Sequence, residues 1–314
     1  MKLPLNTTAK ILVADRVHHE LNVLGRGVRI AVIDDGDIFG HQTSIIAHIK
    51  TIAPEVEIIE LPFMRDDSEQ SHLSSFIESI YRAIRERADI LNISSGLNNN
   101  IVNHRGLEDT IKDVVENHRI IMAASVGNSG YFMPGHKQVS ISYPAVDPHV
   151  IAVGGVYYDI DTHKIQASNI ALSGQQQHND RKCPDVCGLC GMLPYGKYIM
   201  APTRAGSLVD YICSTQLHDG TAPDDGIIGC TLTSDSVAMV SGVIALMLEY
   251  DKENRKNPEL VRQRLEASCV DVVEGFSGSG HHAHEGRDLA TGAGLVHAYD
   301  AVMFGELREG GETN

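Results

Sequence analysis

The chain has 314 residues, of which 42% are hydrophobic and 21% charged. This length and apolar content suffice to bury the core of one large α/β domain or of two smaller ones. The 41 acidic and 26 basic residues give a formal net charge of -15, which argues against a nucleic-acid surface. No stretch is long and apolar enough to span a membrane, and the N-terminus lacks the apolar core of a signal peptide. We therefore expect a cytoplasmic protein whose six cysteines are reduced.

Apolar strand-like segments and helical segments alternate along the first half of the chain. The strand-like segments lack polar alternation, which is typical of a parallel sheet covered on both faces. We predict one doubly wound α/β domain over residues 1–314. The predicted strands are 28–33, 56–61, 90–94, 120–124 and 150–153, and the predicted helices are 12–24, 43–52, 74–87 and 107–117.

The segment 231–249, TLTSDSVAMVSGVIALMLE, predicts a helix at the centre of the domain. It is almost continuously apolar after Asp235, so a helix here would be buried on all sides. Its polar start places Thr233, Ser234 and Asp235 where free backbone N–H groups favour hydroxyls and carboxylates. Ser234 is therefore either a helix cap or a nucleophile. A nucleophile requires a histidine held by a carboxylate and a donor for the oxyanion.

Polar clusters follow three of the predicted strands. Asp34 ends the first strand, Ser94-Ser95-Gly96 ends another, and Gly127-Asn128 lies just beyond a third. Ligands of doubly wound sheets gather at the carboxyl ends of the strands, so these clusters share one edge. His41 follows Asp34 closely and is expected to open the next helix. The sequence thus brings a carboxylate and an imidazole near one another at this edge.

Four segments resemble the chemical blocks of the subtilisin-like serine peptidases. Together with two framing segments, YPAVDPHVIAVGGV and GAGLVHAYDAV, they extend the resemblance from about Val28 to Ala301. One short block is weak evidence, but four in the order Asp, His, Asn, Ser are specific. The resemblance implies a three-layer α/β/α fold, with a shortened segment from Asp to His, and hydrolysis of peptide bonds. The four blocks are AVIDDG at 31–36, HQTS at 41–44, AASVGNSG at 123–130 and TSDSVAMVSGVIALML at 233–248.

The resemblance also implies roles for individual residues. Asp34 would orient His41, the general base, while Ser234 would be the nucleophile and Asn128 the side-chain donor to the oxyanion. A peptide substrate would bind in extended form, backbone to backbone, along one strand end. The residues implied to line the substrate site are Ser94, Ser95, Gly96, Ser125, Val126 and Gly127.

Some residues near the implied site depart from the family pattern. The acid after the nucleophile, Asp235, is either a cap of its helix or a charge that favours the protonated imidazole of His41. Asp35 beside Asp34 adds a further negative charge. The departures leave open an inactive homologue that binds extended peptides. They occur at Gln42, Ser44, Leu232, Asp235, Ser236 and Ala238.

A cysteine-rich segment, CPDVCGLC, lies in a polar excursion predicted at about 173–195. Its three thiols could bind zinc or an iron–sulfur cluster, with Cys213, Cys230 or a histidine as the fourth ligand. A regulatory disulfide and no ligand at all are the alternatives. Histidines at 281, 282 and 284 form a second possible cluster, more typical of a solvated loop. The three thiols are those of Cys183, Cys187 and Cys190.

Three functions follow from these patterns. The first is a cytoplasmic serine endopeptidase, which we expect to remove a leader from a peptide or protein and to need no cofactor for catalysis. The second is the inactive homologue, and the third is a metal- or redox-responsive protein built on the cysteine segment. Peptide or protein substrates are the expected partners in the first two cases, with neither nucleic acid nor membrane. The oligomeric state is left open.

Overall fold

The computed structural model describes residues 2–34, 39–62, 69–97, 105–128, 140–176, 180–193 and 197–304. Parts of the predicted chemical blocks, 35–36 and 129–130, lie outside the described residues, and Asp35 is among them. Parts of the predicted excursion, 177–179 and 194–196, lie outside them as well.

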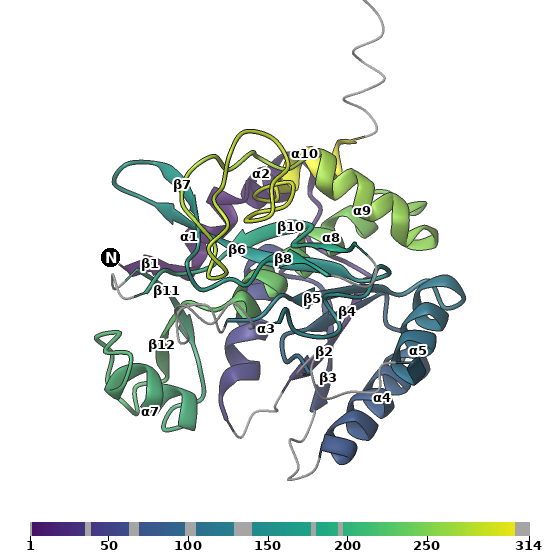
Figure 1. The fold of residues 1–314 in the computed structure, drawn as a ribbon, viewed down its shortest axis with the longest axis horizontal. Helices are drawn as coiled ribbons and strands as arrows, with labels where there is room; N and C mark the ends of the chain where they lie inside the picture. Colours follow the sequence, from purple (N-terminus) through teal and green to yellow (C-terminus); the bar gives the residue numbers. More distant parts are fainter. Residues whose placement is uncertain are drawn as a thin grey trace, which may run out of the picture.

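A seven-stranded sheet forms the centre of the described structure (Figure 1). The strand order is β10-β6-β5-β4-β2-β3, with β7 paired to β6. All neighbours are parallel except β6 and β7. The predicted doubly wound, mostly parallel sheet is therefore confirmed. The strands are β2 (Arg29–Asp34), β3 (Glu57–Pro62), β4 (Ile90–Ile93), β5 (Ile121–Ser125), β6 (Ile151–Asp159), β7 (Lys164–Ala167) and β10 (Val186–Leu189).

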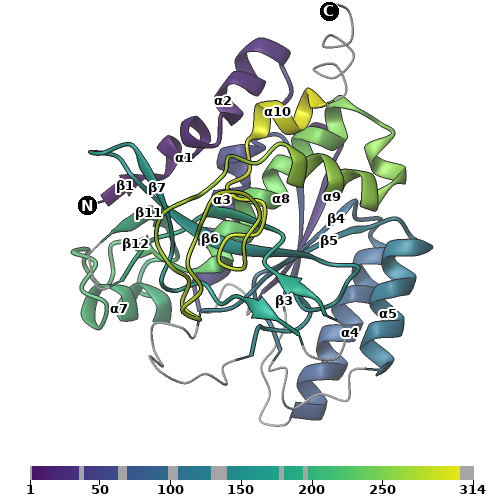
Figure 2. The same ribbon diagram turned by 45° about the horizontal axis from the view of Figure 1, so that its top comes forward.

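Two apolar cores cover the two faces of this sheet. Along β2, Ile30 and Val32 belong to one buried cluster, whereas Ala31 and Ile33 belong to the other. This division follows from the alternation of side chains along a strand. Helices close both clusters and complete the three layers, which Figures 1 and 2 show from two directions. The first cluster includes α3 (His41–Ile52) and α8 (Thr233–Tyr250), and the second includes α4 (Glu69–Arg85) and α5 (Arg105–Glu116).

Helix α8 is enclosed along almost its whole length, as its sequence predicts. All residues from Thr233 to Leu248 are buried. The helix packs between the sheet and α3, and small residues allow close approach on both sides. At Gly242 a Cβ would lie 2.7 Å from the Ile52 Cβ, and at Gly188 of β10 a Cβ would lie 2.5 Å from the Ser236 carbonyl oxygen. The position of α8 thus depends on close contacts at Gly188 and Gly242 that any larger residue at these two positions would prevent.

Other elements surround this frame. A small sheet contains β1 (Lys2–Pro4), β11 (Tyr198–Pro202) and β12 (Ile227–Cys230), and a two-stranded ribbon joins β8 (Gly174–Gln175) to β9 (Lys182–Cys183). The remaining helical elements are α1 (Leu5–Ile11), α2 (Ala14–Arg16), a π-helix (Val17–Leu21), α7 (Leu208–Thr215), a 3₁₀ turn (Asn254–Lys256), α9 (Pro258–Ala267) and α10 (Ala298–Val302).

The N-terminal helical region differs from its predicted bounds of 12–24. It begins earlier, with α1 at Leu5, and is interrupted where Val13 adopts a left-handed conformation at φ 59°. Such a conformation strains a β-branched residue and ends a regular helix. The apolar spacing predicted helical structure in this region but could not reveal this break.

The predicted excursion at about 173–195 also requires correction. Its apolar part, Val186–Leu189, is wholly buried and forms β10 at one end of the strand order, parallel to β6. The preceding Asp185 carboxylate accepts two hydrogen bonds of 2.6 Å from Arg181 and one from the Ala152 N–H. Burial alone would raise the pKa of Asp185, but Arg181 and the charge of Arg262 lower it. The surrounding polar residues therefore anchor a strand instead of forming a loop.

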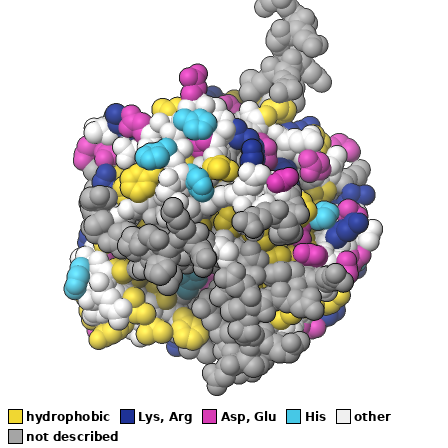
Figure 3. Space-filling model, in the orientation of Figure 1, with side chains coloured by type: hydrophobic (Ala, Val, Ile, Leu, Met, Phe, Trp, Pro, Cys, Tyr) yellow, Lys and Arg dark blue, Asp and Glu magenta, His cyan; other side chains and the backbone are white. Residues whose placement is uncertain are grey.

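The surface carries mixed charge. Figure 3 shows acidic and basic side chains interspersed over the face that it presents. Hydrophobic side chains gather at its lower left, where α7 lies in Figure 1, and Leu208 and Tyr211 of α7 are exposed. Among the described helices, none combines the length and hydropathy needed to cross a bilayer.

We predict that Gly242→Ala destabilises the protein by about 1–3 kcal/mol, because the new methyl group would overlap Ile52 across the α3–α8 contact. Denaturant unfolding, followed by circular dichroism, measures this loss. The matched control is Gly106→Ala in α5, where nothing lies within 4 Å of the added Cβ. The control is expected to be unchanged or slightly more stable. Equal stability of Gly242→Ala and wild type would contradict the proposed packing constraint.

Candidate active site

Asp34 and His41 meet at the carboxyl edge of the sheet. Asp34 is the last residue of β2 and is fully buried, while His41 is the first residue of α3. The His41 Nδ1 lies 2.8 and 2.9 Å from the two carboxylate oxygens. An Nδ1–H donated to the carboxylate leaves the lone pair of the neutral imidazole on Nε2. This tautomer is the one that a general base requires.

The short connection from Asp34 to His41 is held at its end by a distant segment. Gly40 precedes α3 with φ at 85°, and its carbonyl accepts a hydrogen bond of 2.7 Å from the Thr203 hydroxyl. A Cβ at Gly40 would lie 2.1 Å from the Ser207 Oγ, so only glycine fits this contact. The Val209 N–H also donates to the Phe39 carbonyl at 3.0 Å. The region from β11 to α7 thus positions the start of α3.

Ser234 lies at the start of α8, facing the end of β4. Its hydroxyl donates a hydrogen bond of 3.2 Å to the Ser94 carbonyl, and the Ser94 hydroxyl lies 3.4 Å from the Ser234 carbonyl. The Ser125 hydroxyl, at the end of β5, lies 3.5 Å from the same Ser94 carbonyl. The structure therefore brings the start of α8 against the ends of two central strands.

Asn128 is fixed by the residue before Ser234. Its Oδ1 accepts hydrogen bonds from the Thr233 N–H at 2.8 Å and from the Thr233 hydroxyl at 2.7 Å. Because both contacts engage the amide oxygen, the amide NH₂ remains the donor group of this side chain. Thr233 is thus an orienting residue that the sequence analysis did not identify. Its position in the sequence, directly before Ser234, gave no signal of this orienting role.

The predicted substrate-lining residues lie close together but are engaged within the protein. Ser142 separates the two groups: a Cβ on Gly96 would meet its Cβ at 2.7 Å, and its N–H donates to the Val126 carbonyl. The Gly127 carbonyl accepts from the Leu172 N–H. Ser95 is buried beside them. The chain that continues from these segments, at 98–104 and 129–139, lies outside the described residues, so the substrate-lining role stays a prediction.

Asp235 caps α8 and pairs with a histidine of α3. Its Oδ2 accepts a hydrogen bond of 3.0 Å from the Leu232 N–H, and its Oδ1 lies 3.2 Å from the His48 Nε2. Burial alone would raise the pKa of Asp235, but the nearby His48, the charge of His41 and the Leu232 N–H lower it. The predicted cap is therefore present, and the carboxylate has an imidazole partner of its own. His48 was missed, although it follows His41 by two helical turns.

The cysteine segment does not form the cluster that its spacing suggested. All three side chains are buried, and their thiols hydrogen-bond to separate carbonyls, of Ala145, Thr291 and Gly191. Burial raises the pKa of the Cys183 and Cys190 thiols to about 12 each. All six cysteines of the chain are free.

The metal expectation at Cys183, Cys187 and Cys190 is thus not supported, because strand β10 separates thiols that are close in sequence. Among the described residues, one set of three possible donors lies within 4.8 Å of one another, formed by His48, Cys230 and Asp235. The histidine cluster at 281–284 is not such a set; the His281 Nδ1 lies 2.8 Å from the Ser173 hydroxyl.

The fold is similar to that of several solved structures. A lanthipeptide protease aligns with 19% identity over 96% of this chain and 94% of its own, at a TM-score of 0.70. MycP1 without its N-terminal propeptide aligns with 19% identity over 94% and 96%, at a TM-score of 0.65. The prenylagaramide maturation protease PagA aligns with 18% identity over 92% and 96%, at a TM-score of 0.59. These likenesses establish the fold.

The family comparison covers most of the chain. The Peptidase_S8 model of the subtilase family matches residues 36–294, a range that includes His41, Asn128 and Ser234 and begins just after Asp34. No curated protein matches the sequence. Because the family match covers α8 and every strand of the central sheet except β2, the chain belongs to the subtilase family and is a serine endopeptidase.

Proposed function

We propose that this subtilase hydrolyses peptide bonds through Asp34, His41 and Ser234, with Asn128 as the side-chain donor to the oxyanion. The contact of 2.8 Å between Asp34 and the His41 Nδ1 carries the proposal, because it holds the imidazole in the tautomer of a base. The orientation of Asn128 by Thr233 supports the donor role.

The proposed mechanism has two steps. The Ser234 Oγ attacks the carbonyl carbon of the peptide bond while its proton passes to the His41 Nε2. Asp34 stabilises the resulting imidazolium, and the Asn128 amide donates to the oxyanion. His41 then gives the proton to the leaving amine, which departs from the acyl-enzyme. Water, deprotonated by His41, attacks the acyl carbon and releases the acid together with free Ser234.

The substrate is proposed to be a peptide or protein from which a leader or propeptide is removed. Two similar structures, a lanthipeptide protease and a prenylagaramide maturation protease, support this class. The substrate would bind in extended form beside 94–96, with 125–127 on the other side. A cytoplasmic location is part of the same proposal, since six cysteines without a disulfide suit a reducing compartment.

One observation favours the alternative of an inactive homologue that binds extended peptides. The Ser234 hydroxyl donates to the Ser94 carbonyl, so it must turn away from that acceptor before it can give its proton to His41. A serine-directed probe separates the two functions, because only an activated hydroxyl reacts with it.

We predict that wild-type protein reacts with a fluorophosphonate probe and that Ser234→Ala neither reacts nor hydrolyses peptides. The fold should persist, since the lost hydrogen bond costs only about 1 kcal/mol. Ser236→Ala is the matched control on the same buried helix, where the hydroxyl contacts the Leu189 carbonyl. It should be labelled like wild type. Failure of the folded wild-type protein to react would favour the inactive homologue.

We predict that Asn128→Ala lowers kcat by roughly a hundredfold or more while KM changes little, because the oxyanion forms only during reaction. Thr233→Val keeps the N–H donor to Asn128 but loses the hydroxyl donor, so its kcat should fall by about tenfold. Steady-state kinetics on a peptide substrate measures both effects. Thr51→Val, whose hydroxyl contacts Ala47 on α3, is the control. Unchanged kcat in Asn128→Ala would refute the donor role.

A further inference from the structure

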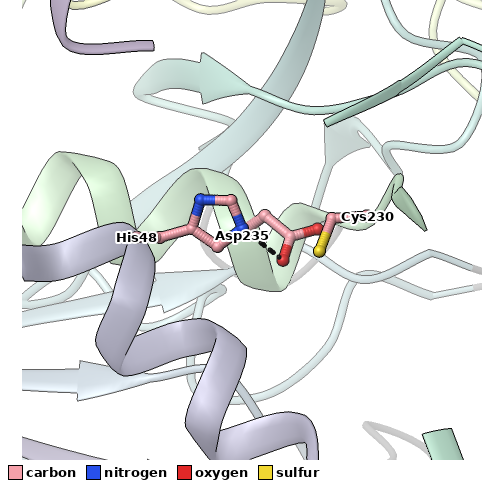
Figure 4. A group of neighbouring side chains, drawn as sticks. All are labelled: His48, Cys230 and Asp235. Carbon is pink, nitrogen blue, oxygen red and sulfur yellow. Dashed lines mark ion pairs between the residues drawn. The ribbon is translucent and has the colours of Figure 1, made fainter. Parts of the chain in front are cut away.

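We propose that His48, Cys230 and Asp235 bind a zinc ion, buried between α3, β12 and α8. The three residues come from three separate elements and point toward one another (Figure 4). Their exposed fractions are 0%, 5% and 2%, so the group is closed to bulk solvent. Imidazole nitrogen, thiolate sulfur and carboxylate oxygen are the ligands that zinc takes in proteins.

His48 supplies the second observation. Both of its ring nitrogens are buried, and neither has a hydrogen-bond partner. The Asp235 Oδ1 lies 3.2 Å from Nε2, but not in the direction of a hydrogen bond. An unsatisfied buried polar group costs about 1–3 kcal/mol. A metal ion on the imidazole would satisfy one of these two nitrogens, which lack a hydrogen-bond partner.

The distances fit an ion of this size. The His48 Nε2 and the Asp235 Oδ1 are 3.2 Å apart. With an ion 2.0–2.1 Å from each atom, the angle between the two bonds at the ion would be about 100°, close to the tetrahedral angle. The three possible ligand atoms all lie within 4.8 Å of one another. A single point therefore lies at most about 2.8 Å from each of them, and this point is where the ion would sit. Zinc binds sulfur at about 2.3 Å, so shifts of roughly half an ångström complete the site.

The charges also balance. One thiolate and one carboxylate neutralise a divalent ion, while His48 binds as the neutral imidazole. Binding releases the proton of the Cys230 thiol to solvent, and no electron is transferred. Three protein ligands leave the fourth position of the tetrahedron to a water molecule.

The position of the ion connects this site to the active site. His48 lies on the helix that begins with His41, and Asp235 follows Ser234 directly. An ion bound to both would link α3 to α8. This link would hold the proposed base, His41, and the proposed nucleophile, Ser234, at a fixed distance from each other. This consequence rests on the proposed function, whereas the zinc site itself does not.

Metal content of the full chain, purified without oxygen or chelators, tests the proposal. We expect about one zinc ion per chain in wild type and less than about a tenth in His48→Asn and in Cys230→Ser. The control Cys269→Ser, which changes a thiol that contacts the Leu265 carbonyl, should keep the ion. Cys187→Ala should keep it as well, because that thiol contacts the Thr291 carbonyl.

Two further measurements guard against variants that do not fold. Wild type stripped by a chelator should regain a higher Tm when zinc is added, because zinc binds the folded state. Cobalt added instead should give a thiolate charge-transfer absorption that Cys230→Ser lacks. Stripped wild type that takes up neither metal would overturn the proposal and leave a metal-free His48–Asp235 pair. Loss of zinc in Cys187→Ala alone would overturn it in favour of another site. Fluorophosphonate labelling tests the active site separately.

Discussion

The burial of α8 is the constraint on which the rest of the structure depends. A helix without a polar face must be covered on all sides, and here the sheet and α3 cover it at contacts that admit only glycine, at Gly188 and Gly242. These contacts determine where its N-terminus lies. Because parallel strands expose their carboxyl ends at one edge, the polar start of α8 meets the ends of β4 and β5 there.

A buried carboxylate directly after the proposed nucleophile adds a second constraint. Asp235 is buried, and a buried charge is tolerated only with hydrogen bonds or an opposite charge. The Leu232 N–H supplies a hydrogen bond to one carboxylate oxygen, and the His48 Nε2 lies 3.2 Å from the other. The departure of Asp235 from the family pattern is therefore matched by a histidine on the facing helix. The burial of Asp235 and that of His48 are explained only when the two residues are considered together.

The short connection between Asp34 and His41 shows a similar dependence on distant chain. Its end is held by Thr203 and Ser207, which follow β11 and precede α7. The segment that follows the small sheet of β1, β11 and β12 therefore positions the first turn of α3. The position of the proposed base depends on residues more than 160 positions away.

The sequence by itself determined the alternation of strands and helices, the buried α8, and the shared edge of Asp34, Ser94 and Asn128. These features follow from local apolar runs and from the direction of parallel strands, which act over short stretches of chain. Only the tertiary structure decided the separation of Cys183 from Cys187 and Cys190, the strand β10, and the pairing of His48 with Asp235. Each depends on contacts between segments far apart in sequence, where spacing carries no information. Three thiols within eight residues therefore lie apart, whereas His48, Cys230 and Asp235 meet.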